Sequence, residues 1–429
     1  MRNQSIKILG LLGLIVLSNA GQAAVLTFDE SVRLAAQNNP DLRSADASVA
    51  AAEHRWRAAR SGFLPQLSGS VSASDSSSDT TTTTTTTNAT TTTTTTGANY
   101  SAGVTATQNL FAGFQDQAKV EQGAANLESA RALLSGAKAR LSSDLKNAYA
   151  SLLYAQNNVA LTQDILRRLE ENLRLVDLRF QSGRENKGSF LLTRASVAQA
   201  RFEHNQARNA LVSAQAQLAR VLGQPVAALD VVSNVPTVEP AFTPDFDDLM
   251  RQTPDVRDAL AREQAAQAGV RLAQAGFYPS VNLSGSVLRD GDRWFPDDNR
   301  RVISATISIP FFTGGRDYYG VRGAAADLDV SKANRDSIER QLLVRLRQNY
   351  AAYVESVEKL QVDREFLEAA ETRANIARAR YQNGLISFED WDRIENDLIQ
   401  RQKALLVSQR GRIEAEAAWE LVQGRGVIP

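Results

Sequence analysis

Residues 63–70 read FLPQLSGS and residues 277–286 read FYPSVNLSGS, so one motif occurs twice, with its prolines 214 positions apart. Two further landmarks repeat with a spacing of 201 positions. They are Phe111-Ala112-Gly113, which returns as Phe312-Thr313-Gly314, and Phe180-Gln181-Ser182-Gly183, which returns as Tyr381-Gln382-Asn383-Gly384. An ordered internal repeat indicates one structural plan built twice. We therefore assign residues 25–235 to a first repeat and residues 241–424 to a second.

The first copy is 13 residues longer than the second between its first two landmarks, and the threonine-rich tract 80–96 lies there. Because the second copy lacks these residues, we expect the tract to be an inserted loop and not a core element. A segment of such low complexity is typical of a polar spacer, either flexible or glycosylated.

The stretches between the glycines of the last two landmarks contain no proline and are rich in helix-forming residues. Apolar residues recur every seven positions, which indicates coiled-coil packing. These positions are Leu145, Leu152, Val159, Leu166, Leu173 and Phe180, then Leu346, Tyr353, Leu360, Leu367, Ala374 and Tyr381. We predict long helices over 113–182 and 315–383, each about 100 Å long, with Gly183 and Gly384 as C-terminal caps. Shorter helical runs are expected at about 28–62, 190–222, 247–276 and 388–421.

Four segments alternate apolar residues with Ser, Thr or Asn, and we expect them to be strands. Their approximate ranges are 65–75, 99–110, 279–289 and 301–311. This alternation is the pattern of a membrane β-barrel, although a soluble sandwich with one buried face would also show it. Aromatic residues stand at the helix-proximal end of every strand and favour the barrel, because they would form a girdle at the membrane interface. They are Phe63, Phe111, Phe277, Tyr278, Phe311 and Phe312.

Composition argues against catalysis and against nucleic-acid binding. Lys plus Arg and Asp plus Glu both number 48, so no net positive charge attracts nucleic acid. Cysteine is absent, which excludes disulfides, thiolate metal sites, cysteine nucleophiles and a lipoprotein anchor. The two histidines, His54 and His204, are far apart in sequence, and no phosphate-binding glycine motif follows a strand. We therefore expect neither an enzyme nor a site for a cofactor or a metal.

Residues 1–24 have the features of a signal peptide. Arg2 and Lys7 are positively charged, residues 8–17 are apolar, and small residues follow. No later segment approaches the roughly 20 consecutive apolar residues of a spanning helix. The exported chain is therefore expected to be either soluble or a barrel protein.

Four strands cannot close a barrel, and an open sheet edge cannot lie in lipid. Closure would need other copies of the chain, and an eight-stranded barrel of two copies would be filled by its own side chains. Three or four copies would leave a lumen wetted by Ser, Thr and Asn. The pattern of residues does not choose between three and four.

Taken in order, four landmarks resemble those of TolC-type outer membrane efflux proteins. They are Phe63-Leu64-Pro65-Gln66-Leu67, Asn109-Leu110-Phe111-Ala112-Gly113, Ile309-Pro310-Phe311-Phe312-Thr313-Gly314-Gly315 and Tyr381-Gln382-Asn383-Gly384. The resemblance implies a mainly α-helical homotrimer with a shared 12-stranded β-barrel in the outer membrane and a helical α-barrel in the periplasm of a Gram-negative bacterium. It also implies two partners, a periplasmic adaptor (membrane fusion protein) and an inner-membrane pump, either proton-driven or of the ABC type. Drug efflux, metal efflux and type I secretion of peptides or proteins all stay open.

The hairpin tips beyond the long helices are the expected docking surface for the adaptor, although a solvated turn would look the same. The first tip is charged and the second is short and apolar. The docking candidates are Gly183, Arg184, Glu185, Lys187, Gly188, Leu385, Ile386 and Ser387.

The resemblance also implies a periplasmic gate near the second tip, with Tyr381, Gly384, Asp390 and Arg393 as candidates. Asp390 stands nine positions after Tyr381, where the family has an Asp that faces the constriction. Converging carboxylates of this kind would attract cations. A second family Asp is replaced here by Arg393, which could pair with Asp390 or Glu389, so a doubly acidic gate is in doubt. The alternative for Asp390 is an ordinary exposed charge on a helix.

Three functions account for the predicted helices and strands to different extents. An exit duct explains both the long helices and the four strands. A periplasmic rod or adhesin stalk without a pore explains only the helices. A soluble secreted hydrolase is the third candidate, and the lack of catalytic motifs argues against it. Conductance of a stable oligomer in a planar bilayer separates the duct from the rod.

Overall fold

The computed structural model describes residues 24–84, 89–225, 229–232, 235–240 and 244–429. The predicted signal peptide lies outside the described residues up to position 23, and Ala24 begins the short strand β1 (Ala24–Leu26). The chain forms two compact units, each assembled from three separate stretches. The first unit comprises the stretches up to 39, 143–238 and 354–417, and the second comprises 40–142, 239–353 and 418–429.

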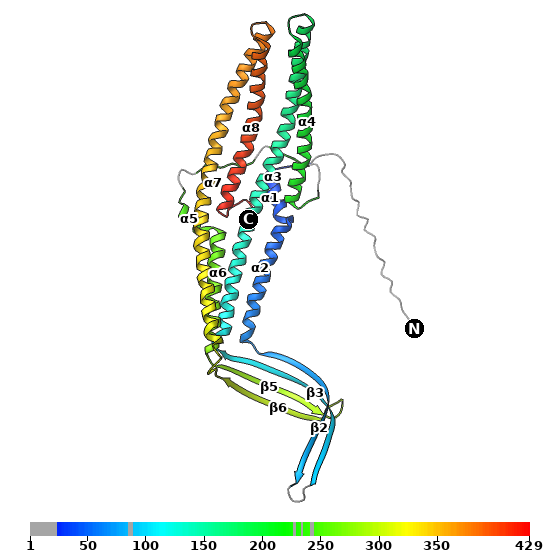
Figure 1. Cartoon of the computed structure of the whole chain (residues 1–429), viewed down its shortest axis with the longest axis vertical. Coiled ribbons are helices and arrows are strands. Elements are labelled where there is room, and N and C mark those ends of the chain that lie inside the picture. Colours follow the sequence, from blue (N-terminus) through cyan, green and yellow to red (C-terminus); the bar gives the residue numbers. More distant parts are fainter. Residues whose placement is uncertain (1–23, 85–88, 226–228, 233–234, 241–243) are drawn as a thin grey trace, which may run out of the picture. The chain divides into compact units, whose positions relative to one another are not determined.

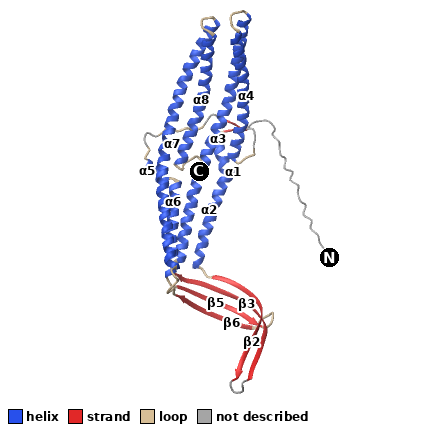
Figure 2. Ribbon diagram, in the orientation of Figure 1, coloured by secondary structure: helices blue, strands red, loops and turns tan. Residues whose placement is uncertain are grey.

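The second unit contains a four-stranded antiparallel sheet (Figures 1 and 2). Its strands are β2 (Gln66–Thr84), β3 (Ala89–Ala112), β5 (Ser280–Gly291) and β6 (Asp298–Ser308), in that spatial order. The two repeats therefore contribute one hairpin each, and they meet at β3 and β5. Strands β2 and β6 are left as the two edges of the sheet.

The register of the sheet separates apolar from hydroxyl side chains, as the alternation predicts. One row of directly opposed residues contains Leu67, Ala106, Gly285 and Ile303. The next row contains Gln66, Thr107, Ser284 and Ser304. Because successive side chains point to opposite faces of a strand, the sheet has one apolar face and one hydroxyl-bearing face. Ile303 is 85% exposed, so the apolar face of this single chain is uncovered at that point.

The threonine tract is not the inserted loop that we expected. β2 continues to Thr84 and β3 begins at Ala89, and these two residues form the last pair of the hairpin. Beyond the pair of Tyr100 with Gly291, β2 and β3 have only each other as partners in the sheet. Threonine is β-branched and favours extended backbone, so the 13 extra residues lengthen a strand pair. Residues 85–88 lie outside the described part of the chain.

Five helices lie in the second unit, either whole or with their N-terminal parts. They are α2 (Pro40–Ala59), α5 (Phe246–Gln252), α6 (Pro254–Gln274) and the N-terminal parts of α3 (Gln115–Gln181) and α7 (Arg316–Gln382). Val256, Leu342 and Leu346 form a buried cluster against which Phe246 and Trp419 pack. Of the helices in the described ranges, none is long and apolar enough to cross a membrane.

Each helical run that we predicted ahead of a strand pair is two helices instead of one. The break falls before Pro40 in the first repeat and before Pro254 in the second. Proline disfavours helical backbone in the residue before it. Asn39 and Thr253 accordingly have extended backbone, with ψ angles of 125° and 147°.

The first unit is a set of helices with one small parallel strand pair, β1 and β4 (Leu229–Val231). Its helices are α1 (Phe28–Asn38), α4 (Lys187–Leu222), most of α8 (Phe388–Val422) and the C-terminal parts of α3 and α7. The predicted seven-residue positions are buried or half-buried along both long helices. The coiled-coil pattern thus marks the packed faces of α3 and α7.

Two left-handed glycines of the first unit differ in how much room they have. Gly223 has a φ of 67°, and a β-carbon there would lie 2.4 Å from the Asn38 carbonyl oxygen. Gly183 has a φ of 73° with open space around it. We expect Gly183→Ala to lower the free energy of unfolding by about 1 kcal/mol, from backbone strain alone. Gly223→Ala should lower it by about 2–4 kcal/mol, because the clash adds to the strain. Urea unfolding followed by helical circular dichroism measures both, and equal losses would contradict the steric argument.

Candidate gate and docking site at the hairpin tips

The two helical hairpins end in turns with the same geometry. Gly183 and Gly384 both have a φ of 73°. The Arg184 N–H donates to the Arg179 carbonyl and the Leu385 N–H to the Arg380 carbonyl, both at 2.8 Å. This six-to-one bond after a left-handed glycine is the Schellman motif. The equal geometry at a spacing of 201 positions shows that the two tips are structural equivalents.

Tyr381 lies in a buried aromatic cluster below the second tip. Its ring is 1% exposed and stacks on Trp391, with ring centroids 4.3 Å apart and planes 8° from parallel. Val176, Ala377 and Phe388 complete the buried cluster. Tyr381 was predicted as a gate residue, and the structure places its ring in this core. Trp391 was not among the predicted site residues.

Polar contacts tie Tyr381 to the first hairpin. Its hydroxyl donates to Glu185 Oε2 at 2.8 Å, and the Arg179 guanidinium donates to its carbonyl at 2.9 Å. The same guanidinium lies 4.6 Å from the centroid of the Tyr381 ring, within cation–π range. Burial, followed by the hydrogen bond to Glu185 and the charge of that residue, raises the pKa of the Tyr381 hydroxyl. The hydroxyl therefore stays protonated and keeps donating.

A second set of charged residues connects the two hairpins, further from the tips. Glu395 is buried, accepts from Arg378 at 2.8 Å and lies 3.8 Å from the Arg168 Nε. Burial lowers the pKa of the Arg168 guanidinium, and Arg378 lowers it further, while Glu395 opposes both. We did not predict this set from the sequence. The sequence does contain a feature that indicates a buried acid. Glu395 falls at helical spacing among the apolar residues Phe388, Trp391 and Leu398, so it lies on the apolar face of α8.

Asp390 and Arg393 lie outside that core. The Asp390 carboxylate accepts from the Ser387 hydroxyl at 2.9 Å and from Arg393 at 3.0 Å, and the Asp390 N–H donates back to Ser387 Oγ at 3.1 Å. Arg393 thus pairs with Asp390, which was one of the two partners considered. Both side chains are more than half exposed on the single chain. The other two gate candidates also touch, because the Gly384 N–H donates to the Tyr381 carbonyl at 2.9 Å. Ser387 caps α8, since its Oγ accepts from the Asp390 N–H.

The docking candidates divide between exposed and packed positions. Arg184, Lys187, Leu385 and Ser387 are exposed, as are Gly183 and Gly188. Glu185 and Ile386 are half-buried, the first against Tyr381 and the second against the aromatic cluster. The exposed members are the ones that a partner could reach without unpacking the tips.

The candidate girdle residues gather at one end of the sheet. Gln66 pairs with Thr107, Ala112 pairs with Ser280, and Ser280 pairs with Ser308, so the helix-proximal ends of all four strands coincide. Five of the six aromatic residues are exposed on the single chain and Phe111 is half-buried. The exposed ones are Phe63, Phe277, Tyr278, Phe311 and Phe312.

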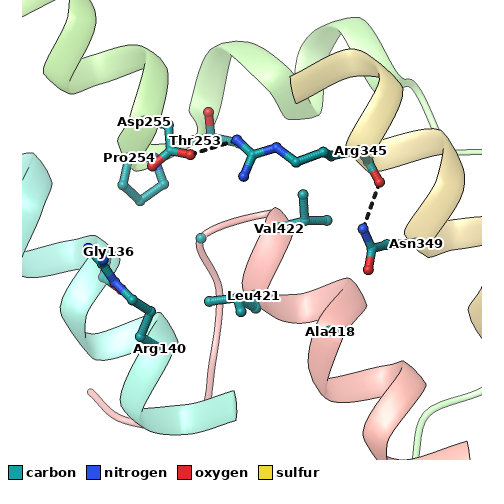
Figure 3. A pocket seen from close by; sticks show the side chains of 11 residues that line it. Gly136, Arg140, Thr253, Pro254, Asp255, Arg345, Asn349, Ala418, Leu421 and Val422 are labelled. Atoms are coloured by element: carbon teal, nitrogen blue, oxygen red, sulfur yellow. Dashed lines mark hydrogen bonds and ion pairs between the residues drawn. The ribbon is translucent and has the colours of Figure 1, made fainter. Parts of the chain in front are cut away.

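A cavity of about 280 Å³ in the second unit has polar and apolar walls (Figure 3). Arg345 forms an ion pair with Asp255 at 3.0 Å, and Arg140 lies on α3. Thr253, also in the wall, donates its hydroxyl to the Met250 carbonyl. Within the described residues, no group of three or more His, Asp or Glu side chains could hold a metal ion.

Two tandem copies of a strand pair, a long helix and a hairpin tip define the class of TolC-like outer-membrane proteins. A profile described as outer membrane efflux protein matches residues 32–224 and 246–425. The chain belongs to the outer membrane efflux protein family, which confirms the resemblance stated above. The protein is therefore an outer-membrane protein, and its fold class is the predicted combination of long helices with a four-stranded sheet.

Individual relatives are similar over most of their length. The chain is 23% identical over 391 residues to the probable efflux pump outer membrane protein TtgC of Pseudomonas putida, which covers 88% of this chain and 79% of TtgC. The crystal structure of the outer membrane protein VceC from Vibrio cholerae has a TM-score of 0.79 at 22% identity, covering 93% of this chain and 96% of VceC. The Campylobacter jejuni CmeC outer membrane channel has a TM-score of 0.81 at 17% identity, covering 99% and 94%.

Proposed function

We propose that three copies of this chain form an outer-membrane exit duct that conducts substrates passively. The observation that carries the proposal is a four-stranded sheet with unpaired edges β2 and β6 and an uncovered apolar face. In lipid, each edge must pair with another strand. A ring in which β6 of one copy meets β2 of the next satisfies both edges and has 12 strands in a trimer. The family resemblance supports three copies over four.

The opposite face of the sheet supports a watery lumen. Ser72 and Ser101 share a hydrogen bond of 2.7 Å across β2 and β3, and Ser284 and Ser304 share one of the same length across β5 and β6. With the apolar face toward lipid, these hydroxyls line the inside of the ring. Conduction needs no catalytic group, which agrees with a family of efflux proteins. The substrate is selected elsewhere in such a system, since a hydroxyl-lined duct offers little chemical discrimination.

The hairpin tips are the proposed contact with a periplasmic adaptor that links the duct to an inner-membrane pump. TtgC is named as a component of an efflux pump, and this supports a pump partner. Arg184 and Lys187 give the first tip positive charge, whereas Leu385 gives the second an apolar, 71% exposed side chain. Contacts from Tyr381 to Glu185 and Arg179 hold the two hairpins together below the tips. A gate that opens here has to break or rearrange them.

Asp390→Asn tests the gate. Three carboxylates near one axis would concentrate cations, so we expect the variant to reduce the cation-over-anion permeability ratio about twofold or more. The ratio follows from the reversal potential across a salt gradient in a planar bilayer. Glu389→Gln is the matched control, because Glu389 is the neighbouring exposed acid. An unchanged reversal potential in Asp390→Asn removes this residue from the gate.

The duct itself is tested on the purified mature protein. We expect a detergent-solubilised trimer by light scattering and discrete conductance steps in planar bilayers. A stable oligomer without conductance would support the rod instead. A monomer that stays in solution without detergent would refute the membrane ring altogether.

A further inference from the structure

The strand pair β5–β6 carries two arginines on the apolar face of the sheet. Ile303 belongs to the apolar row described above, and Arg301 lies two positions from it on β6. Residues two positions apart share a face of a strand. Val287 is directly opposite Arg301, and Arg289 lies two positions further along β5. Both arginines are exposed and lie on the face that would meet lipid.

The two arginines stand at the far end of the apolar segments. On β5, the segment from Val281 near the helix-proximal end to Arg289 is nine residues long. On β6, the apolar face runs from Ile307 through Ile303 and ends at Arg301. About 9–11 residues of tilted strand cross the hydrocarbon core, and arginine on the lipid face costs little only near the interface. In the proposed ring, both guanidinium groups therefore lie at the headgroup level of the outer leaflet.

The two faces of this strand pair differ in how their arginines are paired. On the hydroxyl-bearing face, Arg300 donates to Asp290 Oδ2 at 3.3 Å. Arg289 and Arg301 have the same diagonal relation across the strands, but both are positive. Arg289 donates to the neutral side-chain oxygen of Asn299 at 2.9 Å. In the part of the chain that the structure describes, neither Arg289 nor Arg301 forms an ion pair with an acid. Like charges this close repel each other, and an anion between them would relieve the repulsion.

We propose that Arg289 and Arg301 form a binding site for the phosphate of a lipid headgroup in the outer leaflet. Guanidinium groups present paired N–H donors in the geometry that phosphate oxygens accept. The acids of the strand pair, Asp290 and Asp298, are directly opposed on the other face, away from this site. The proposal rests on the proposed membrane ring and adds a ligand that conduction does not require.

Native mass spectrometry of the purified trimer tests the site. Trimers in detergent are titrated with bis-phosphorylated lipid A, or with the same lipid after both phosphates have been removed. We expect the phosphorylated lipid to bind about tenfold more tightly or better. The double variant Arg289→Gln with Arg301→Gln should bind the phosphorylated lipid no more tightly than the dephosphorylated one.

Arg300→Gln is the matched control, because it removes a guanidinium from the same strand but from the opposite face. We expect it to bind the phosphorylated lipid as the wild-type protein does. Replacing both Arg289 and Arg301 by lysine keeps the charges and loses the planar fork, so its affinity should be intermediate. If the double glutamine variant does not assemble, each single glutamine variant should still show a partial loss of affinity.

The outcomes separate this site from the proposed function. Equal binding of the two lipids, or unchanged binding by the glutamine variants, would show that the arginines hold no lipid phosphate. Inorganic phosphate at the same phosphate concentration should not displace the lipid, and displacement would make this a site for free phosphate instead. Each of these failures leaves the conductance of the wild-type trimer intact. A wild-type protein that forms no conducting trimer refutes the membrane ring itself.

A neighbouring copy of the chain is the competing occupant. Asp75 is exposed on the apolar face of β2, and in the proposed ring β6 of one copy meets β2 of the next. An ion pair between Arg301 and Asp75 of the next copy would make Asp75→Asn and Arg301→Gln lower the melting temperature of the trimer alike. We expect Asp75→Asn to change neither the melting temperature nor the binding of phosphorylated lipid. Matching losses of melting temperature, without an effect on lipid binding, would overturn the phosphate site.

Discussion

Trp391→Ala is expected to lower the free energy of unfolding by about 3–5 kcal/mol, because it removes the largest side chain buried at the hairpin tips. Trp391 is 2% exposed and stacks face to face on Tyr381. The cavity left behind is bounded by Phe388 and Val176, which belong to different hairpins and can close on it only by moving the helices that carry them. Urea unfolding of the detergent-solubilised protein, followed by circular dichroism, measures the loss.

Trp294→Ala is the matched control for this prediction. Trp294 is 68% exposed and has an edge-on contact with Tyr100 at 5.5 Å. Its removal should change the free energy of unfolding by about 0.5 kcal/mol or less. Because the Tyr381 contacts join the hairpins, Trp391→Ala should also increase single-channel open time, while Trp294→Ala should not. Equal stability losses in the two variants would mean that the aromatic cluster does not hold the tips.

The second large effect is expected at a buried ion pair of the first unit. Lys146 Nζ lies 3.1 Å from Glu416 Oε1, and both side chains are less than 5% exposed. Glu416 Oε2 also accepts from the Val238 N–H at 3.3 Å. Lys146→Met takes away the ammonium group and leaves the carboxylate in the interior, which typically costs about 3–5 kcal/mol. The same urea unfolding experiment measures the loss.

Two further variants show whether the loss of stability depends on burial of the ion pair or follows the loss of any charged side chain. Arg167→Met breaks an ion pair with Asp164 whose side chains are 72% and 63% exposed, and should cost about 0.5 kcal/mol or less. The double variant Lys146→Met with Glu416→Leu should recover most of the lost stability, because an apolar pair can replace a buried ion pair. If the double variant is as unstable as Lys146→Met alone, packing and not the lost ammonium charge explains the lower stability.

The spacing of apolar residues predicted most of the helices and strands, because this spacing is a property of the local sequence. The seven-residue spacing along the long helices and the two-residue alternation along the strands each state which face of an element is buried. The pairing of Leu67 with Ala106 and of Gly285 with Ile303 puts the apolar residues on one face, as the alternation predicts. The prediction of a loop at 80–96 was wrong, because residues that one repeat lacks can still lengthen a strand pair, and the β-branched side chain of threonine favours extended backbone.

What the sequence by itself determined is the duplicated plan: one long helix and one strand pair in each repeat, with glycines where the helices end. What only the tertiary structure decided is which side chains meet across the repeats. Tyr381 and Glu185 are 196 positions apart, and Glu395 joins Arg168 and Arg378 from two other helices. Such contacts depend on how the packed helices are aligned along and around their axes. The strain at Phe114 is likewise a property of the folded backbone. The residue types at positions 113 and 114 do not show that the turn between β3 and α3 gives Phe114 a positive φ angle.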